Sequence, residues 1–270
     1  SSPAVLSTFI SILCQRVGID AAELDVSELT DSLEGYSIAR RDSVRSGIAP
    51  LQIAYSFDGL ESDNKIAFRK RGRSSVATIP MDDLAARVSG ENPPPVVANV
   101  RKLETELPRE VAVSHYDAER AYELGSQYDR RLTGQSEEVS ALDLPIVMTP
   151  AKAAQIAQMV LYERWASRNE QEIAVSRKYA DLEPTDVITV TTDVATMRLR
   201  IGEKVEAGGV IKLRTVSEDV DVYESEAAGV SGPAAPGSVT EAGPTNLMLL
   251  GCRGTSAHQG FGRRCGALCC

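Results

Sequence analysis

The chain has 270 residues, 43% hydrophobic and 25% charged, which is the composition of a globular protein with a sizeable core. Its formal net charge is −9, and because the last twenty residues hold three arginines and no acid, residues 1–250 carry −12. An acidic body repels nucleic acid, which argues against non-specific DNA or RNA binding. The sequence lacks a run of eighteen apolar residues, so no membrane-spanning helix and no stable membrane insertion are predicted.

Two helical patterns occur early in the chain. Ser2 and Pro3 are suited to cap and begin a helix, and apolar residues at helical spacing follow as far as Gly18. Residues 43–55 predict a second amphipathic helix, which we expect to be interrupted at Pro50. The opening segment has neither the basic region nor the apolar stretch of a signal peptide, and it is typical of the inside of a longer protein.

The clearest β signal follows. Residues 35–40 resemble a strand, and further on the turn residues 62–64 separate two alternating runs that predict a hairpin. A third run at 75–79 would complete a small meander. Residues 81–87 can begin another helix.

A proline run at 91–97 predicts a stiff, extended linker. Residues 106–117 and 137–145 then resemble strands. A Thr-Pro pair begins a long helix at about 149–169, because threonine caps well and proline suits the first helical position.

Strands dominate the next part of the chain, at 170–179, 185–191, 196–205 and 208–220. Gly208 and Gly209 predict a tight hairpin between the last two. From Gly229 the composition changes to Gly, Pro, Ala and Ser, which is typical of a flexible linker. The elements predict an α+β fold of short antiparallel sheets and small β-barrel-like modules, with one long helix and several shorter helices.

The predicted organisation has five segments. They are a helix-plus-β-meander module (1–90), a Pro-rich linker with a short extension (91–107), a strand-rich module with the long helix (108–224), a flexible linker (225–250) and a Cys/Gly/Arg-rich tail (251–270) that we expect to be disordered.

Catalytic patterns are scarce. His115 is the one histidine of the body, and Ser114 beside it would point to the opposite face of a strand, so the two do not form a nucleophile–base pair. Cys14 lies in an apolar helical pattern and is interpreted as a core residue. Acids such as Asp58 and Asp63 lie around the predicted hairpin, where carboxylates usually serve turns and solvation. We therefore predict no catalytic residue, no cofactor and no enzyme.

One dense basic run stands out, formed by Arg69, Lys70, Arg71 and Arg73. On the outgoing strand of a hairpin it could contact phosphate or an acidic surface of a neighbouring subunit. The alternative is a solvated edge that prevents wrong strand pairing. Aromatic residues are not interleaved with the basic ones, which makes the run a weak nucleic-acid signal.

The last twenty residues differ from the rest of the chain. They hold four of the five cysteines, Cys252, Cys265, Cys269 and Cys270, together with His258. The ligands suffice for zinc, but a C-x2-C pair and an apolar pattern that could fold around the metal are missing. We expect no metal site here.

Six stretches, taken in order, carry a resemblance to a known family. They are VLSTFISILCQRVGID, LDVSELTDSLEGYSIARRDSVRSGIAPL, FDGLESDNKIAFRKRGR, ETELPREVAVSHYDAERAYELGSQYDRR, DLPIVMTPAKAAQIAQMVLYERW and SRKYADLEPTDVITV. Together they resemble the tail-hub region of the large host-specificity tail protein of gene transfer agents and related long-tailed phages, over roughly residues 1–250. The TIM-barrel-like domain that precedes this region in the family is absent here.

The resemblance implies a structural part of the virion. A hub of this family closes the end of the tail tube in the baseplate, usually as a trimer, with the distal tail protein above it and adhesion parts below. It implies assembly in the bacterial cytoplasm, a final place at the tail tip, and contact with DNA only as DNA passes through the channel. An acidic wall would let that DNA slide without sticking.

The family pattern breaks off after Leu250, where relatives continue into a Leu/Asp/Pro-rich segment. Residues 251–270 are therefore interpreted as a frame-shifted end without a selected function, and receptor binding by this chain is in doubt. Two alternative functions stay open: a tail-tip enzyme that degrades the cell wall, and a receptor- or carbohydrate-binding module. The second would need exposed aromatic residues, whereas the single tryptophan, Trp165, lies on a helix face that we expect to be buried.

Overall fold

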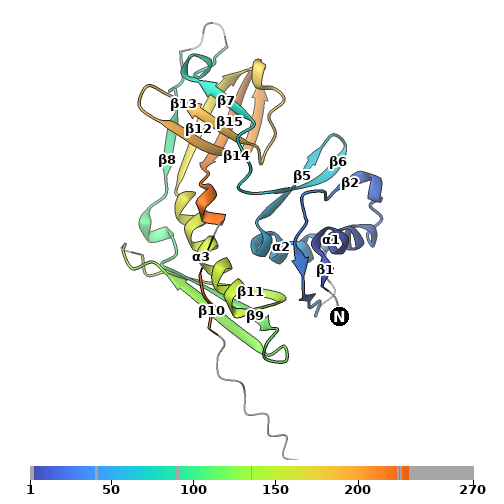
Figure 1. Ribbon diagram of the computed structural model, residues 1–270. Helices are drawn as coiled ribbons and strands as arrows, with labels where there is room; N and C mark the ends of the chain where they lie inside the picture. Colours follow the sequence, from blue (N-terminus) through green and yellow to red (C-terminus); the bar gives the residue numbers. More distant parts are fainter. Residues whose placement is uncertain are drawn as a thin grey trace, which may run out of the picture. The chain divides into compact units, whose positions relative to one another are not determined.

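The computed structural model describes residues 3–39, 42–88, 90, 92–134, 136–223, 225 and 227–230. Residues 1–234 form one compact unit. Residues 235–270 form a second unit, which lies outside the described residues, and so do the predictions made above for the tail. The described part contains three α-helices and fifteen strands, which confirms the α+β prediction (Figure 1). These strands form four open sheets and no closed barrel. None of these helices is long and apolar enough to cross a membrane.

The first helix, α1 (Leu6–Gln15), begins later than expected. The predicted start at Ser2 and Pro3 is wrong, because β1 (Ala4–Val5) is extended and pairs with β3 (Ser32–Leu33). This two-stranded ladder fixes the entry to α1, so tertiary pairing overrides a favourable local capping signal.

The second helix, α2 (Val44–Tyr55), is capped by Ser43, whose hydroxyl accepts a hydrogen bond from the Ser46 N–H at 3.1 Å. The expected interruption at Pro50 is wrong, since the helix continues through it. Proline costs one backbone hydrogen bond, but the next residue, Leu51, is fully buried and holds the helix against the core.

The predicted hairpin is confirmed. Strands β5 (Phe57–Ser62) and β6 (Lys65–Lys70) pair antiparallel around Asp63 and Asn64, which have φ values of 50° and 59°. Asp and Asn tolerate this left-handed backbone better than most residues, as a two-residue hairpin turn requires. Strand β2 (Leu24–Asp25) adds parallel to β6 and completes a three-stranded sheet.

The predicted meander and the helix that was to follow it are wrong. Strand β7 (Ala77–Pro80) leaves the hairpin and pairs parallel with β13 (Val187–Thr191) in another sheet. Ile79 of this strand is fully buried in the six-stranded sheet, and this burial of apolar surface favours the observed pairing. Only a 3-10 turn forms at Met81–Asp83, and Ala85 has a φ of 55°, which ends it.

A four-stranded sheet has the order β10 (Leu124–Arg130), β9 (Glu110–Asp117), β11 (Val139–Met148) and β4 (Gly35–Tyr36). The predicted strands at 106–117 and 137–145 are thus confirmed with shifted ends, whereas β10 was not predicted. The strand expected at 35–40 shortens to the two residues of β4, which pair with β11.

The long helix α3 (Pro150–Ala166) begins at the predicted Thr-Pro pair, and the Thr149 hydroxyl accepts from the Lys152 N–H at 3.4 Å. It lies against β9 and β10 (Figure 1). Its buried side chains join those of α1, α2 and β9 in a first core, which also contains Cys14 at 2% exposure. The interpretation of Cys14 as a core residue is therefore confirmed.

The largest sheet has six strands in the order β7, β13, β14 (Thr196–Ala207), β15 (Val210–Ser217), β12 (Asn169–Ser176) and β8 (Ala98–Arg101). Gly208 and Gly209 join β14 to β15 with φ values of 62° and 81°, so this predicted hairpin is confirmed. The inner face of the sheet forms a second core. Short 3-10 turns also lie at Ala21–Glu23, Glu104–Glu106, Arg177–Tyr179 and Val220–Tyr223.

The predicted segment boundaries stay predictions. Strand β7, from the first predicted module, and strand β8, from the predicted linker, both belong to the six-stranded sheet. The two cores are thus built from segments that alternate along the chain.

His115 lies on the buried face of β9, two residues before Asp117 on the same face, and is fully buried. It faces Gly125 of β10. A Cβ added at Gly125 would lie 2.9 Å from the imidazole ring, so the missing side chain leaves room for the ring. Burial lowers the pKa of His115, although the charge of Asp117 opposes this.

We expect this histidine to make the protein less stable in mild acid. Because its pKa is lower in the folded chain, the unfolded chain binds the proton first, so stability falls as pH drops below about 6.5. Urea unfolding at pH 7.5 and pH 5 measures the loss. In His115→Leu the difference between the two pH values should shrink; an unchanged difference would show that other groups cause it.

Candidate functional site: the basic run and its ion pairs

The four basic residues singled out in the sequence lie at the end of β6 and in the segment that follows. Arg69 and Lys70 are the last two residues of the strand, and Arg71 and Arg73 come directly after it. All four side chains are 19–31% exposed and lie within 4 Å of a carboxylate of the same chain. The run is therefore neither a bare cationic patch nor a freely solvated edge.

The first two cations bind acids that lie between α1 and α2, one on β2 and one directly before β3. Arg69 pairs with Asp25 at 2.6 Å, and the Lys70 ammonium pairs with Asp31 at 2.5 Å. The same ammonium donates to the Tyr55 carbonyl at 2.8 Å, at the end of α2. Together, these contacts hold the hairpin against the end of α2 and against the segment that precedes α2.

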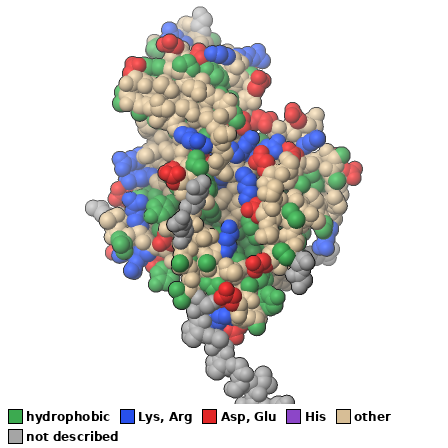
Figure 2. Space-filling view, viewed as in Figure 1, with side chains coloured by type: hydrophobic (Ala, Val, Ile, Leu, Met, Phe, Trp, Pro, Cys, Tyr) green, Lys and Arg blue, Asp and Glu red, His purple; other side chains and the backbone are tan. Residues whose placement is uncertain are grey.

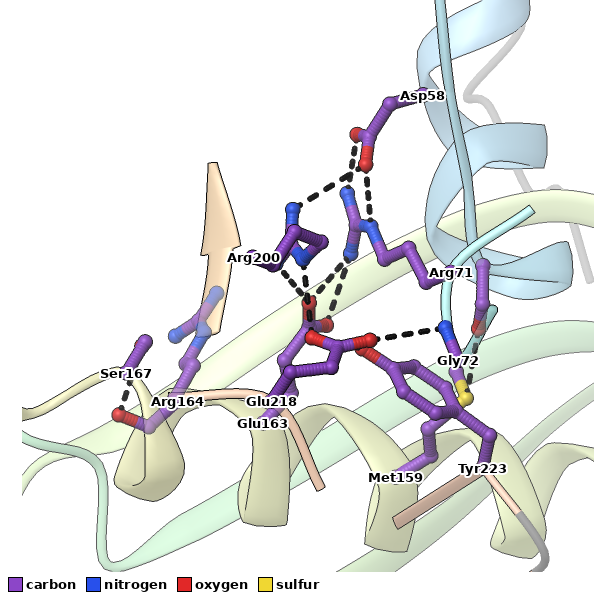
Figure 3. Close-up of polar contacts among 11 residues, drawn as sticks. Asp58, Arg71, Gly72, Met159, Glu163, Arg164, Ser167, Arg200, Glu218 and Tyr223 are labelled. Carbon is purple, nitrogen blue, oxygen red and sulfur yellow. Dashed lines mark hydrogen bonds and ion pairs between the residues drawn. The ribbon is translucent and has the colours of Figure 1, made fainter. Parts of the chain in front are cut away.

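Arg71 makes the strongest contacts of the run. Its Nε and Nη2 donate to the two Asp58 oxygens at 2.8 and 2.6 Å, and its Nη1 donates to both Glu163 oxygens at 2.7 and 2.9 Å (Figure 3). Two-pronged arginine–carboxylate pairs combine charge with geometric specificity. Every nitrogen of this guanidinium is thus engaged.

Arg200, on β14, binds the same two acids and a third one. It lies 3.4 Å from Asp58 and 3.3 Å from Glu163, and its Nε donates to Glu218 at 3.0 Å. The other Glu218 oxygen accepts from the backbone N–H of Gly72 at 2.8 Å. Figure 3 shows Arg71 and Arg200 side by side between Asp58 on one side and the two glutamates on the other.

These five charged residues form what we call the Arg71–Arg200 network: Asp58, Arg71, Glu163, Arg200 and Glu218. They come from β5, the segment after β6, α3, β14 and the segment after β15. The network is largely withdrawn from water, with Glu218 only 2% exposed. It joins the three-stranded sheet, the long helix and the six-stranded sheet at one point.

The network also shifts the pKa values of Asp58 and of the neighbouring Tyr223. Burial raises the pKa of Asp58, but hydrogen bonds from Arg71 and the charges of both arginines outweigh it, so the pKa lies below the usual value. The pKa of Tyr223 is raised by burial and by the neighbouring charges of Glu163 and Glu218. Asp58 thus stays ionised at neutral pH and Tyr223 stays neutral.

The sequence identified some of these residues but not their association. Arg73 lies 3.7 Å from both Glu28 and Asp186, so it too connects segments far apart in the chain. Glu163 and Arg200 carried no signal in the sequence, because single charges on a helix and a strand are common. Asp58 was noted near the hairpin and assigned to turns and solvation, whereas it binds two arginines.

The Arg71–Arg200 network is built from ion pairs. Among them, no three His, Cys, Asp or Glu side chains lie close enough to hold a metal ion. The candidate zinc ligands of the tail lie outside the described residues.

Solved structures with the same fold define the class of protein. A chain in the "Virion of native gene transfer agent (GTA) particle" is 27% identical, with a TM-score of 0.73 over 86% of this chain and 50% of that chain. The prophage MuSo2 43 kDa tail protein from Shewanella oneidensis gives 11% identity and a TM-score of 0.52, covering 85% of this chain and 66% of that one. A tail protein from Neisseria meningitidis MC58 gives 12% and 0.54, covering 83% and 70%. The chain therefore has the fold of phage tail proteins.

The family follows from the sequence match. Residues 43–204 match the Phage-tail_3 family, described as "Putative phage tail protein", and the chain belongs to this family. A comparison with curated protein sequences finds no match. The chain spans half the length of the gene transfer agent chain that it resembles.

Removing one arginine of the network should destabilise the fold strongly. In Arg71→Met, Asp58 and Glu163 lose their main partner while still shielded from water, and we expect a loss of about 3 kcal/mol in the free energy of unfolding. The matched control is Arg214→Met, since Arg214 and its partner Glu203 are 60% and 54% exposed.

The control should change stability by no more than about 0.5 kcal/mol. Chemical denaturation of both variants gives the comparison. Equal losses in the two variants would mean that the network contributes no more than a surface ion pair.

Proposed function

We propose that the chain is part of a tail-tip hub, a ring of three copies in the baseplate that closes the tail tube of a phage-like gene transfer agent. The observation that carries this proposal is the likeness to a chain of the gene transfer agent virion over 86% of this chain, at 27% identity. In this role the chain would contact the distal tail protein on one side and parts that adhere to the host on the other.

The charge and the ion pairs are consistent with such a role. A hub must hold its shape while DNA passes through it, and the Arg71–Arg200 network joins three structural elements through charge-assisted bonds that depend on geometry. The net charge of −9 would keep passing DNA from adhering to the ring. DNA is then a passing ligand and other tail proteins are the lasting partners, in a virion assembled in the bacterial cytoplasm.

Particle composition tests the proposal. Nuclease-resistant particles from producing cells, analysed by peptide mass spectrometry, should contain the peptide of residues 110–120 in a fixed ratio to other tail proteins. Deleting the gene should yield particles without closed tails in electron micrographs. If the protein is abundant in cells but missing from purified particles, the hub role is refuted. A peptidoglycan-clearing assay on the pure protein tests the enzymatic alternative in parallel.

The prediction that the basic run meets an acidic neighbour needs a variant that keeps the internal pairs. Exchanging the partners in the double variant Asp25→Arg/Arg69→Asp preserves the close ion pair between these positions and removes only the longer contact of Arg69 with Glu28 at 3.8 Å, so stability should change by about 1 kcal/mol or less. If an acidic surface of a neighbouring subunit binds Arg69, this folded variant should fail to enter particles. Normal incorporation would mean that Arg69 serves only its own chain.

A further inference from the structure

A second group of cations lies on the other side of α3, around the single tryptophan. Two adjoining hollows of 390 and 340 Å³ share Arg131, Tyr162 and Trp165 in their walls. We call them together the Trp165 groove. Arg101, Arg130 and Leu132 complete the part of the wall used below. Figure 2 shows Lys and Arg side chains gathered beside apolar ones on this side of the unit, at the left of the view.

The centre of the groove is held in place before any partner arrives. The Trp165 Nε1–H donates to the Pro108 carbonyl at 2.9 Å, and the Arg131 guanidinium lies 4.0 Å over the indole ring. Arg131 Nε also donates to the Thr133 carbonyl at 3.2 Å. A guanidinium fixed in this way loses little freedom when it binds a carboxylate.

The charges of the groove differ from those of the basic run. Arg101, Arg130 and Arg131 have no carboxylate within ion-pair distance in the described part of the chain, whereas their neighbour Arg168 pairs with Glu104 at 2.7 Å. Glu104 and Arg168 both lie in the walls, together with two further acids, Asp129 and Asp219, each of which accepts a hydrogen bond from a nearby backbone N–H. The arginines therefore outnumber the acids on a chain whose net charge is −9.

Apolar side chains border these arginines. Leu132 is 84% exposed, Tyr162 is 50% exposed, and Tyr128 on the neighbouring strand β10 is 66% exposed. Trp, Tyr and Arg around exposed aliphatic groups are the composition that dominates binding energy in protein interfaces. Arg131 covers one face of Trp165, and a Cβ added at Gly134 would lie 3.5 Å from the edge of the ring, so the indole offers little room to stack a nucleic-acid base.

We propose that the Trp165 groove binds an acidic, extended protein segment that carries aliphatic side chains. Carboxylates of the segment pair with Arg101, Arg130 and Arg131, and an aliphatic side chain packs between Leu132 and Tyr162. The proposed function enters only as the source of the segment, which would be a neighbouring tail protein. Binding itself is independent of the particle and can be tested on the purified chain.

Trp165 provides the readout, because it is the only tryptophan of the chain. The probe is a ten-residue peptide of glutamates and leucines, and its twin carries lysine in place of each glutamate. Titration of the full chain should change Trp165 fluorescence saturably with the glutamate peptide, and that peptide should bind at least tenfold more tightly than the lysine peptide. Added salt should weaken the binding, since exposed charges are screened.

Variants locate the site. Arg101→Glu/Arg130→Glu should weaken binding of the glutamate peptide at least tenfold, because two attractive charges become repulsive ones. The matched control Lys65→Glu/Lys212→Glu makes the same charge change at exposed lysines outside the groove and should bind within about twofold of the unchanged chain. Circular dichroism melting confirms that both double variants fold.

Several results would overturn the proposal: no saturable change with either peptide, equal binding of the two peptides, or equal weakening in the two double variants. A fluorescence change with an oligothymidylate at lower concentration than with the glutamate peptide would assign the groove to single-stranded nucleic acid instead. None of these results bears on whether the chain is a component of the particle, which the particle composition decides separately.

Discussion

The structure depends on two arginines that share two carboxylates, with a third carboxylate bound to one of them, largely away from bulk water. Arg71 and Arg200 each contact Asp58 and Glu163, and Glu218 closes the group from the end of β15. Charges withdrawn from water cost several kcal/mol each unless they are paired in good geometry. The pairing is complete only when the hairpin, α3 and the six-stranded sheet lie in this one arrangement, so the network selects it.

This constraint divides the cations of the chain into two groups. Those of the basic run are engaged with acids of their own chain, and they stabilise the fold. Those of the Trp165 groove, such as Arg130 and Arg131, have no acidic partner in the described part of the chain, and Arg131 is held in position over the Trp165 ring. A cation that is positioned but unpaired is better suited to a partner molecule than one that must first break an internal ion pair.

For a phage tail protein, rigidity and docking are complementary demands. Charge-assisted bonds between distant segments keep the internal geometry of the chain. Contacts with neighbours require groups that remain available after folding. Tyr128 on β10 and the nearby Leu132 are exposed, and they supply apolar area next to the arginines of the Trp165 groove.

Local chemistry in the sequence determined the elements themselves: the Thr-Pro start of α3, the Asp63–Asn64 and Gly208–Gly209 turns, and the buried place of Cys14. The resemblance to tail proteins was equally a property of residue order. Only the tertiary structure decided where β7 pairs, why α2 continues through Pro50, and which acids meet Arg71. The reason is physical. Turns and caps act over a few residues, so the sequence shows them directly. Burial and ion pairing join positions that are far apart in the chain, such as Arg71 and Glu163, and only the distance between them in the folded structure shows that they pair.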